Sequence, residues 1–376
     1  MMGTGNGIRL GRFFGIPVSL DLSLLVIAGF LTFSLAASYF PAGFPGQAGA
    51  VYVAVAAATS VLFFGSVLAH ELAHSVVSQR NGTPVKGITL WMLGGMAELG
   101  GEPKSAGAEF RIAAVGPLTS LGLAAGFGAL AFAVTELGVH GLVGSALAWL
   151  AFINLVLAIF NLIPGAPLDG GRILMAALWA WRGDRDRANQ GAARAGVVVG
   201  TLLIGVGILQ FLAGFAGGLW TALIGWFITS AARAEGSQAQ LRGRLGEATV
   251  GSVMTRDPER VRGWLTVDAF LTEEASGLRH EVVPVENFDG TIAGVLTPDR
   301  VRLAPAHERT GARVVDVTVP LDAVRTAEPG DQLVDVLLEP SGSTVDHILV
   351  FEGERLVGIV SPRDVERAAR WVGAAR

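Results

Sequence analysis

Residues 51–80 read VYVAVAAATSVLFFGSVLAHELAHSVVSQR, an apolar run long enough to span a membrane that ends in His70-Glu71-Leu72-Ala73-His74. Histidines at positions i and i+4 lie on one face of a helix, where both imidazoles can bind one zinc ion. The glutamate between them can act as a general base toward a zinc-bound water. Ionisable side chains are costly inside a bilayer and mark functional positions there. The run therefore predicts a zinc peptidase site within a membrane helix.

The chain divides into an apolar part and a polar part. It has 376 residues, of which 51% are hydrophobic, and its mean hydropathy is +0.52. Residues 1–235 contain 22 charged side chains and residues 236–376 contain 38, so we expect a membrane-embedded domain over 1–235 followed by a soluble one. The absence of cysteine excludes disulfides and thiolate metal sites. A net charge of −4 argues against nucleic acid as a partner.

Six segments are candidates for membrane spans, the fourth of them interrupted: 18–40, 50–79, 109–135, 142–182, 192–213 and 217–233. The first is too long for a cleaved signal peptide, so we expect an uncleaved anchor. With six crossings, the lysines and arginines near the span ends fall on one side, and the opposite loops have none. The positive-inside rule then places both termini in the cytoplasm and the histidine pair near the cytoplasmic end of the second helix.

A catalytic zinc usually takes three protein ligands, so a third must come from elsewhere in the membrane half. The strongest candidate is Asp169, in the segment Asn161-Leu-Ile-Pro-Gly-Ala-Pro-Leu-Asp169-Gly-Gly. Pro164 and Pro167 break the helix, and unwound backbone at membrane depth is tolerated only where it lines a cavity or is buried in protein. A carboxylate at such a break is expected to be a ligand. The alternative is that Asp169 caps the helix beginning at Gly170, and one side chain can do both.

Other possible ligands are less suitable. His140 is excluded because it falls in a loop on the opposite side of the membrane. Some zinc peptidases extend the motif with a glycine and then a third histidine ligand, but here Val77 occupies the glycine position. Glu98 and Glu102 follow His74 at a spacing that some soluble zinc peptidases use, and they remain open as alternatives.

The two motifs together resemble those of the site-2 protease family of intramembrane zinc metalloproteases. They are His70-Glu71-x-x-His74 and Asn161-x-x-Pro164-x-x-Pro167-Leu168-Asp169-Gly170. The resemblance covers the membrane half and implies one zinc ion held by His70, His74 and Asp169, with Glu71 as base. It also implies that Asn161 hydrogen-bonds the backbone of a transmembrane protein substrate. Gly116-Pro117 matches a further motif, with Ser120 where the family often has Asn, a departure expected to affect packing more than chemistry.

Residues 90–99 read as two short apolar strands around a turn at Gly94-Gly95, which predicts a β-hairpin after the histidine helix. Its free edge could pair with an unwound substrate, because peptidases bind extended chain. We therefore regard Gly94 and Gly95 as substrate-binding candidates. The resemblance implies that this hairpin is re-entrant, and a glycine-rich surface loop is the alternative.

The soluble half contains an internal repeat. Residues 292–301 (IAGVLTPDRV) recur as 356–365 (LVGIVSPRDV), an offset of 64, and residues 236–247 read as a linker. Alternating short strands and helices predict two α/β modules, at 248–306 and 312–372. They resemble a tandem of cystathionine-β-synthase (CBS) repeats, which implies an adenine nucleotide contacted by Ser361 and Asp364. In the first copy Thr297 is followed three residues later by Arg300, so at most one site is expected to be intact. A structural or dimerising role is the alternative.

The predicted protein is thus a polytopic α-helical membrane protein with a soluble α/β CBS pair, expected in a bacterial plasma membrane because abundant Ala, Gly and Arg with little Lys suggest a GC-rich genome. A CBS-regulated transporter or channel is the main alternative, since broken helices also build ion sites. It gives no reason for Glu71 between two histidines. An inactive scaffold is a third alternative, against which the complete ligand and base set argues. The sequence leaves open the substrate, the nucleotide and the oligomeric state.

Overall fold

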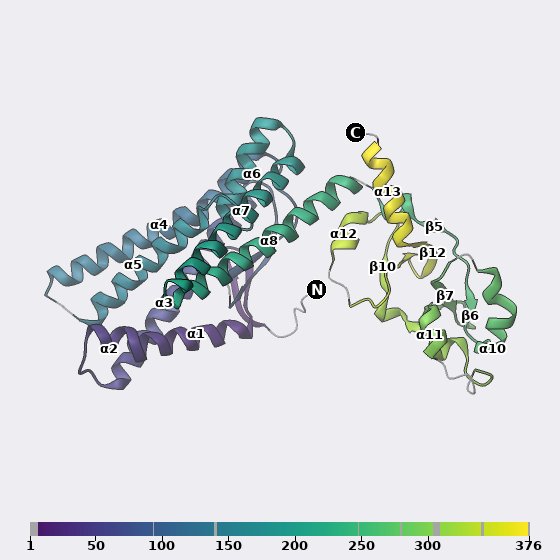
Figure 1. Ribbon diagram of the computed structural model, residues 1–376, viewed down its shortest axis with the longest axis horizontal. Helices are drawn as coiled ribbons and strands as arrows, with labels where there is room; N and C mark the ends of the chain where they lie inside the picture. Colours follow the sequence, from purple (N-terminus) through teal and green to yellow (C-terminus); the bar gives the residue numbers. More distant parts are fainter. Residues whose placement is uncertain are drawn as a thin grey trace. The chain divides into compact units, whose positions relative to one another are not determined.

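The computed structural model describes residues 7–92, 94–138, 141–246, 248–278, 280–303, 309–339 and 342–374 (Figure 1). The chain forms two compact units, one ending at Ala239 and the other beginning at Gln240. We expected a linker over 236–247. Residues up to Leu245 instead continue helix α8 (Gly217–Leu245), so the connection is helical.

The first unit is built from long apolar helices. Five are long and apolar enough to cross a membrane: Leu22–Gly43, which contains α1 (Leu22–Ser34) and the short η1 (Leu35–Tyr39) and α2 (Phe40–Gly43), then α3 (Gly49–Arg80), α4 (Ala106–Glu136), α5 (Leu142–Asn161) and α7 (Arg185–Leu212). The first unit therefore has several helices that are able to span a membrane. The predicted interrupted span is α5 followed by the 14-residue α6 (Asp169–Arg182), which is too short to cross alone. Helix α8 is not among the five, since Gly, Trp, Thr and Ser dilute its apolar stretch.

A four-stranded sheet lies beside these helices in the order β1-β2-β3-β4. Its strands are β1 (Ile8–Phe13), β2 (Ile16–Leu20), β3 (Val85–Trp91) and β4 (Gly94–Leu99). The N-terminal hairpin β1–β2 was not predicted, because residues 18–20 were assigned to the first membrane helix. The predicted hairpin is β3–β4, but its turn precedes Gly94, so Gly94 and Gly95 belong to β4 rather than to the turn.

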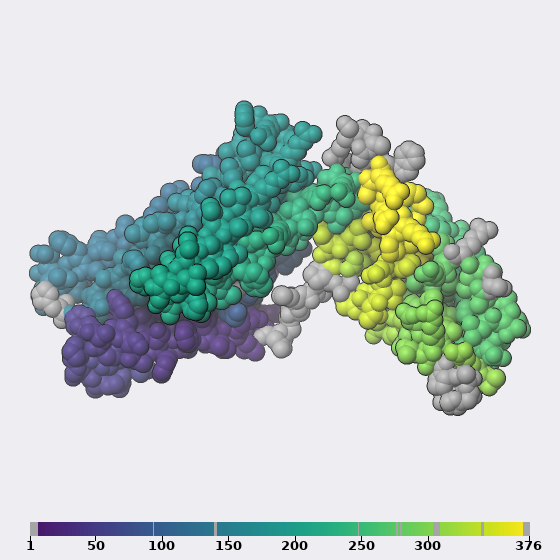
Figure 2. Space-filling model, viewed as in Figure 1, coloured from purple at the N-terminus to yellow at the C-terminus, as the bar shows by residue number. Residues whose placement is uncertain are grey.

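Helices α7 and α8 lie side by side, and Figure 2 shows them against each other on the near face of the unit. Small residues allow this close approach. A Cβ on Gly200 would lie 2.3 Å from the Thr229 hydroxyl oxygen, and one on Gly207 would lie 2.4 Å from the Ala222 nitrogen. The same kind of contact continues at Gly196, where a Cβ would lie 2.9 Å from that of Ala232. Glycine thus fixes α8 tightly against the membrane unit.

The second unit contains two four-stranded sheets with one pairing pattern. The first has the order β6-β7-β8-β9 and the second β10-β11-β12-β5. The sheets are formed by β5 (Thr255–Arg256), β6 (Val261–Arg262), β7 (Val283–Glu286), β8 (Ile292–Leu296), β9 (Val319–Pro320), β10 (Arg325–Ala327), β11 (Ile348–Glu352) and β12 (Arg355–Val360). Short helices complete the unit: α9 (Val250–Val253), α10 (Val267–Ala269), α11 (Pro298–Leu303), α12 (Leu333–Leu338) and α13 (Pro362–Ala374).

The pairing in these sheets follows the sequence repeat. Gly294 pairs with Pro320 in one sheet, and Gly358 pairs with Arg256 in the other. The two glycines are 64 residues apart, and so are their two partners, which is the offset of the repeat. Each sheet therefore takes its edge strand from the segment that opens the other repeat. The two repeats fold as an interlocked pair rather than as separate modules.

Candidate metal centre

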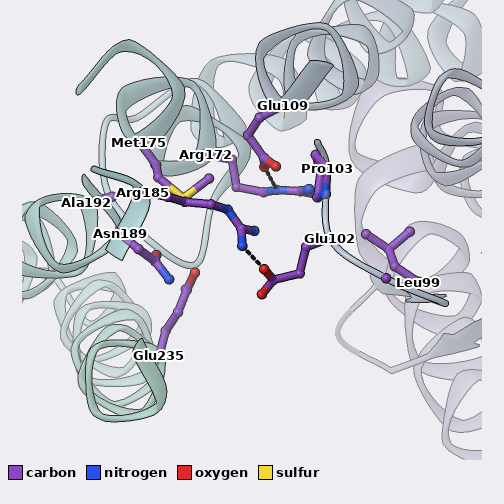
Figure 3. Close-up of a pocket in the computed structure, with 12 residues that line it drawn as sticks. Leu99, Glu102, Pro103, Glu109, Arg172, Met175, Arg185, Asn189, Ala192 and Glu235 are labelled. Carbon is purple, nitrogen blue, oxygen red and sulfur yellow. Dashed lines mark hydrogen bonds and ion pairs between the residues drawn. The ribbon is translucent and has the colours of Figure 1, made fainter. Parts of the chain in front are cut away.

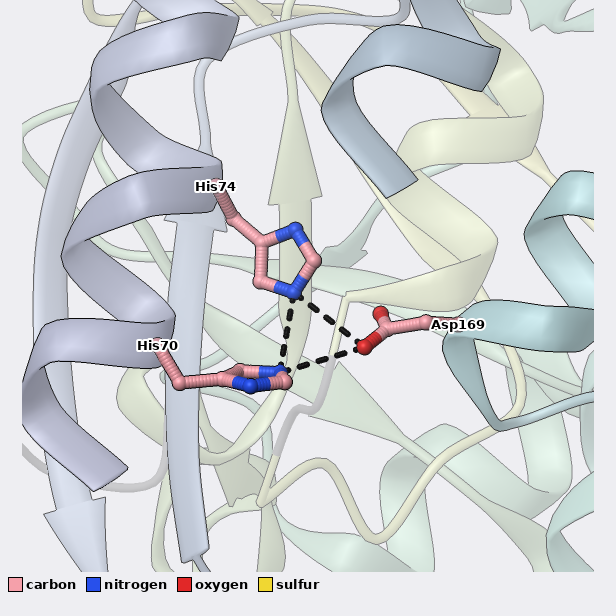
Figure 4. A group of neighbouring side chains, drawn as sticks. All are labelled: His70, His74 and Asp169. Carbon is pink, nitrogen blue, oxygen red and sulfur yellow. Dashed lines mark hydrogen bonds and ion pairs between the residues drawn. The ribbon is translucent and has the colours of Figure 1, made fainter. Parts of the chain in front are cut away.

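Three side chains of the first unit converge on one point (Figure 4). The Nε2 atoms of His70 and His74 are 3.1 Å apart. The Oδ2 atom of Asp169 lies 3.1 Å from His70 Nε2 and 3.2 Å from His74 Nε2. Both histidines are buried, with 4% and 7% of their surface exposed. The i,i+4 pair on α3 and the first residue of α6 are thus brought together although they are 99 and 95 residues apart in the sequence.

Helix α4 orients both imidazole rings from behind. His74 Nδ1 donates to the carbonyl oxygen of Ile112 at 2.5 Å, which leaves Nε2 as the nitrogen with a free lone pair. His70 Nδ1 lies 2.9 Å from the hydroxyl oxygen of Ser120. Ser120 stands where the family often has Asn, and we expected this difference to affect packing more than chemistry. Its hydroxyl contacts a candidate metal ligand, so it bears on the orientation of that ligand.

Gly116 provides the space in which the two rings meet. A Cβ at this position would lie 2.1 Å from His74 Nε2 and 2.6 Å from His70 Nε2. Only glycine lets the backbone of α4 pass this close to the ligand atoms. Gly116 was noted in the sequence only as part of a motif, and its physical role becomes visible in this contact.

The donor set fits zinc. Zinc bonds to imidazole nitrogen and carboxylate oxygen are about 2.0–2.2 Å long, which puts tetrahedral ligand atoms about 3.3–3.6 Å apart. The observed separations of 3.1–3.2 Å are close to that value. Two histidines and one carboxylate are a common ligand set of catalytic zinc sites, which keep a fourth position for water.

Asp169 is oriented by the helix break that precedes it. Helix α6 begins at Asp169, and its N-cap residue, Leu168, makes no side-chain cap. Cβ atoms on Gly170 and Gly171 would lie 2.3 Å from the Ile163 oxygen and the Ala166 nitrogen, so the two glycines let the loop fold back onto the helix start. The carboxylate faces the histidines rather than its own helix terminus, so the capping alternative does not account for its position.

Glu71 lies next to strand β4. A Cβ on Gly95 would lie 2.2 Å from Glu71 Cγ and 2.8 Å from Glu71 Cδ, which shows how closely the strand backbone approaches this carboxylate. In the described part of the chain β4 pairs only with β3, so its other edge remains available. The structure therefore brings the candidate base beside an edge strand that contains Gly94 and Gly95.

The remaining candidates lie outside the metal centre. Glu98 forms an exposed salt bridge with Lys86 at 3.0 Å, and Glu102 pairs with Arg185, so neither approaches the histidines. His140 lies outside the described residues. Asn161 is the last residue of α5 and is half-buried, and the described residues offer its side chain no hydrogen bond.

In the second unit, Ser361 and Asp364 bond to each other at the start of α13. Asp364 Oδ2 accepts from the Ser361 backbone nitrogen at 2.9 Å and from its hydroxyl at 2.7 Å, and the Asp364 nitrogen donates back to Ser361 Oγ at 3.3 Å. This reciprocal pattern is a capping box. Asp364 is 4% exposed and also pairs with Arg367. In the first copy only the Arg300 nitrogen donates to Thr297 Oγ1, at 3.4 Å.

Comparison with known proteins gives this geometry a context. The profile of peptidase family M50 matches residues 58–143 and 135–204, which include the histidine pair and Asp169. Rip3 of Mycobacterium tuberculosis, whose name classes it with the zinc metalloproteases, is 43% identical over 365 residues, covering 96% of this chain and 92% of Rip3. The chain belongs to peptidase family M50. It is accordingly a membrane-embedded zinc metalloprotease of the site-2 type.

Two solved structures are similar to parts of this M50 peptidase. The site-2 protease from Methanocaldococcus jannaschii is 27% identical and covers 61% of this chain and 95% of its own, with a TM-score of 0.41. The CBS domain of the bacterial CNNM/CorC family Mg2+ transporter is 19% identical and covers 37% of this chain and 89% of its own, with a TM-score of 0.30.

Proposed function

We propose that this M50 peptidase hydrolyses peptide bonds in or near the transmembrane segments of membrane proteins. In this proposal His70, His74 and Asp169 hold the zinc ion and Glu71 is the general base. The observation that carries it is the convergence of three ligand atoms that lie within 3.2 Å of one another. Two of them belong to α3, the helix that also holds Glu71, and the third belongs to α6. A bound zinc ion would polarise the scissile carbonyl and favour deprotonation of the attacking water.

The protein residues then have separate tasks. Glu71 accepts a proton from the attacking water and delivers it to the leaving amide nitrogen, so no covalent enzyme intermediate is needed. His74 keeps its Nε2 lone pair directed at the centre because its Nδ1 proton is donated to the Ile112 carbonyl. The backbone of Gly95 lies close to the Glu71 side chain, so the proposed base stands beside strand β4.

The substrate must be presented as extended chain, because the amides of a transmembrane helix are already bonded internally. We propose that it adds as a further strand along the free edge of β4, as a re-entrant element, where backbone groups of Gly94 and Gly95 replace the lost helical hydrogen bonds. Asn161, whose amide has no partner among the described residues, is proposed to bond the substrate backbone.

We further propose a multi-pass arrangement in the plasma membrane with both termini in the cytoplasm. The distribution of lysine and arginine supports it, provided that α8 serves as the sixth crossing. The CBS pair is proposed to bind an adenine nucleotide, with contacts from Ser361 and Asp364, or to form a homodimer, and to modulate cleavage in either case.

A transporter or channel is less well supported, because ion transport gives no role to Glu71 beside an edge strand. The proposal is tested with the full chain in proteoliposomes containing a model transmembrane substrate. We expect Asp169→Ala to lose both zinc and cleavage, while Glu98→Ala keeps both. Full zinc content and full cleavage in Asp169→Ala would show that the third ligand lies elsewhere.

A further inference from the structure

A second polar cluster lies behind the metal centre and takes no part in the proposed chemistry. It lines a cavity of about 150 Å3 at the start of α6 (Figure 3). Glu109 of α4 accepts from Arg172 Nε at 2.8 Å, and Glu109 is only 1% exposed. Glu102 and Arg185 form another ion pair in this cavity, and Glu235 of α8 also lines it. Removing two charged groups from water is costly even when they are paired. The buried Glu109–Arg172 pair therefore calls for an explanation other than stability.

The pair joins α6, which carries Asp169, to α4, whose Ser120 hydroxyl and Ile112 carbonyl contact the two histidines of α3. Arg172 follows Asp169 by three residues on α6, so both side chains lie on one face of that helix. Ile112 follows Glu109 by three residues on α4, so its carbonyl and the Glu109 side chain are one helical turn apart. The two helices are thus linked twice, directly by Arg172 and Glu109, and through His74 by Asp169 and the Ile112 carbonyl.

We propose that Arg172 and Glu109 are positioning residues for the metal centre, which together hold Asp169 at the distance and angle that a shared ion with His74 requires. This inference rests on the proposed zinc site. Helix α6 is short, follows an unwound loop and packs against both α4 and α7. The ion pair adds a directional polar link to α4, one turn beyond the ligand. Loss of the pair lets α6 shift and moves the Asp169 carboxylate away from the imidazole nitrogens.

The test measures zinc affinity rather than activity. Full-length Glu109→Gln, Arg172→Gln and the double variant are purified in detergent, and zinc dissociation constants are obtained by competition with a chelating dye. Each single change is expected to weaken zinc binding about 10–100-fold, as for other residues that support metal ligands. The double variant is expected to bind no more weakly than the worse single variant, because both changes break one interaction. Arg172→Lys, which retains the charge, should recover part of the affinity.

Glu102→Gln is the matched control, because it breaks an ion pair in the same cavity that does not join α6 to α4. It should bind zinc as the unmodified protein does. Unchanged zinc affinity in Arg172→Gln, or losses that multiply in the double variant, would overturn the inference. If Glu109→Gln fails to fold, Arg172→Gln and Arg172→Lys decide the matter alone. Asp169→Ala distinguishes failure of the proposed zinc site from failure of the positioning role. If Asp169→Ala keeps zinc, the proposed site itself is wrong. If Asp169→Ala loses zinc and Arg172→Gln keeps it, only the positioning role is wrong.

Discussion

Gly116→Ala is the most revealing single change, because it adds one methyl group to the proposed metal centre without altering any proposed ligand. The new Cβ would lie 2.1 Å from His74 Nε2, about 1.3 Å short of the 3.4 Å at which ordinary contact begins. It would also lie 2.5 Å from His74 Cε1 and 2.6 Å from His70 Nε2. The rings have little freedom to retreat, since both are buried and each is held at Nδ1 by α4 itself.

The expected consequence is loss of zinc. Ligand distances in a zinc site are held to within about 0.2 Å, so a displacement of more than about 1 Å removes a ligand from the set. We expect zinc affinity to fall by at least about 100-fold, the upper end of the range for residues that only support ligands, and cleavage to fall below detection. Overpacking should also destabilise the fold by about 1–3 kcal/mol. Helix propensity alone predicts the opposite sign, a gain of about 1 kcal/mol for Gly→Ala.

The assay combines zinc content by mass spectrometry, zinc affinity by dye competition and cleavage in proteoliposomes. Gly122→Ala and Gly126→Ala are matched controls on the same helix, because a Cβ at either position meets nothing within 4 Å. Both should keep zinc and activity. Stoichiometric zinc and normal cleavage in Gly116→Ala would refute the assignment of this point as the metal centre.

Three further outcomes are expected. Asn161→Ala should slow cleavage while zinc stays bound, because the amide is proposed to contact substrate and not metal; a changed metal content would instead assign Asn161 to the helix break. Asp364→Ala should abolish adenine-nucleotide binding in calorimetry. In the first copy Asp299 stands one residue before the position equivalent to Asp364, so Asp299→Ala should reduce binding less, and equal losses would contradict the asymmetry between the repeats. Burial lowers the pKa of His347, so the folded protein favours its neutral form, and stability should fall as the pH drops below about 6.5, the ordinary pKa of histidine. His347→Gln should flatten that part of the pH dependence of thermal unfolding, and an unchanged slope would exclude His347 as its source.

The convergence of the histidine pair and Asp169 could be predicted from the sequence because each has a local signature. An i,i+4 spacing fixes two imidazoles on one helix face, and prolines and glycines around a carboxylate mark a helix break. The hairpin after α3 was also predictable from apolar runs around glycines. Its turn was displaced by about two residues because strand register depends on the partner strand, which local sequence does not specify.

The supporting residues were not predictable in the same way. Gly116 and Ser120 act through contacts with a helix about 40–50 residues earlier, and nothing in their own segment states which helix that is. The strand β1 was missed because its residues adjoin an apolar run, and the boundary between strand and helix is set by pairing with β3 through β2. The helical continuation of α8 was missed because a Gly-, Ser- and Gln-containing stretch is also typical of a linker.

The most direct test of the account compares Glu71→Gln with the unmodified full-length protein in one preparation of proteoliposomes. Zinc content and cleavage of a transmembrane substrate are measured on the same samples. We expect a zinc content equal to that of the unmodified protein and no cleavage, because the substitution removes the proposed base and leaves His70, His74 and Asp169 intact. Cleavage at the unmodified rate with full zinc would contradict the assignment of Glu71 as the general base.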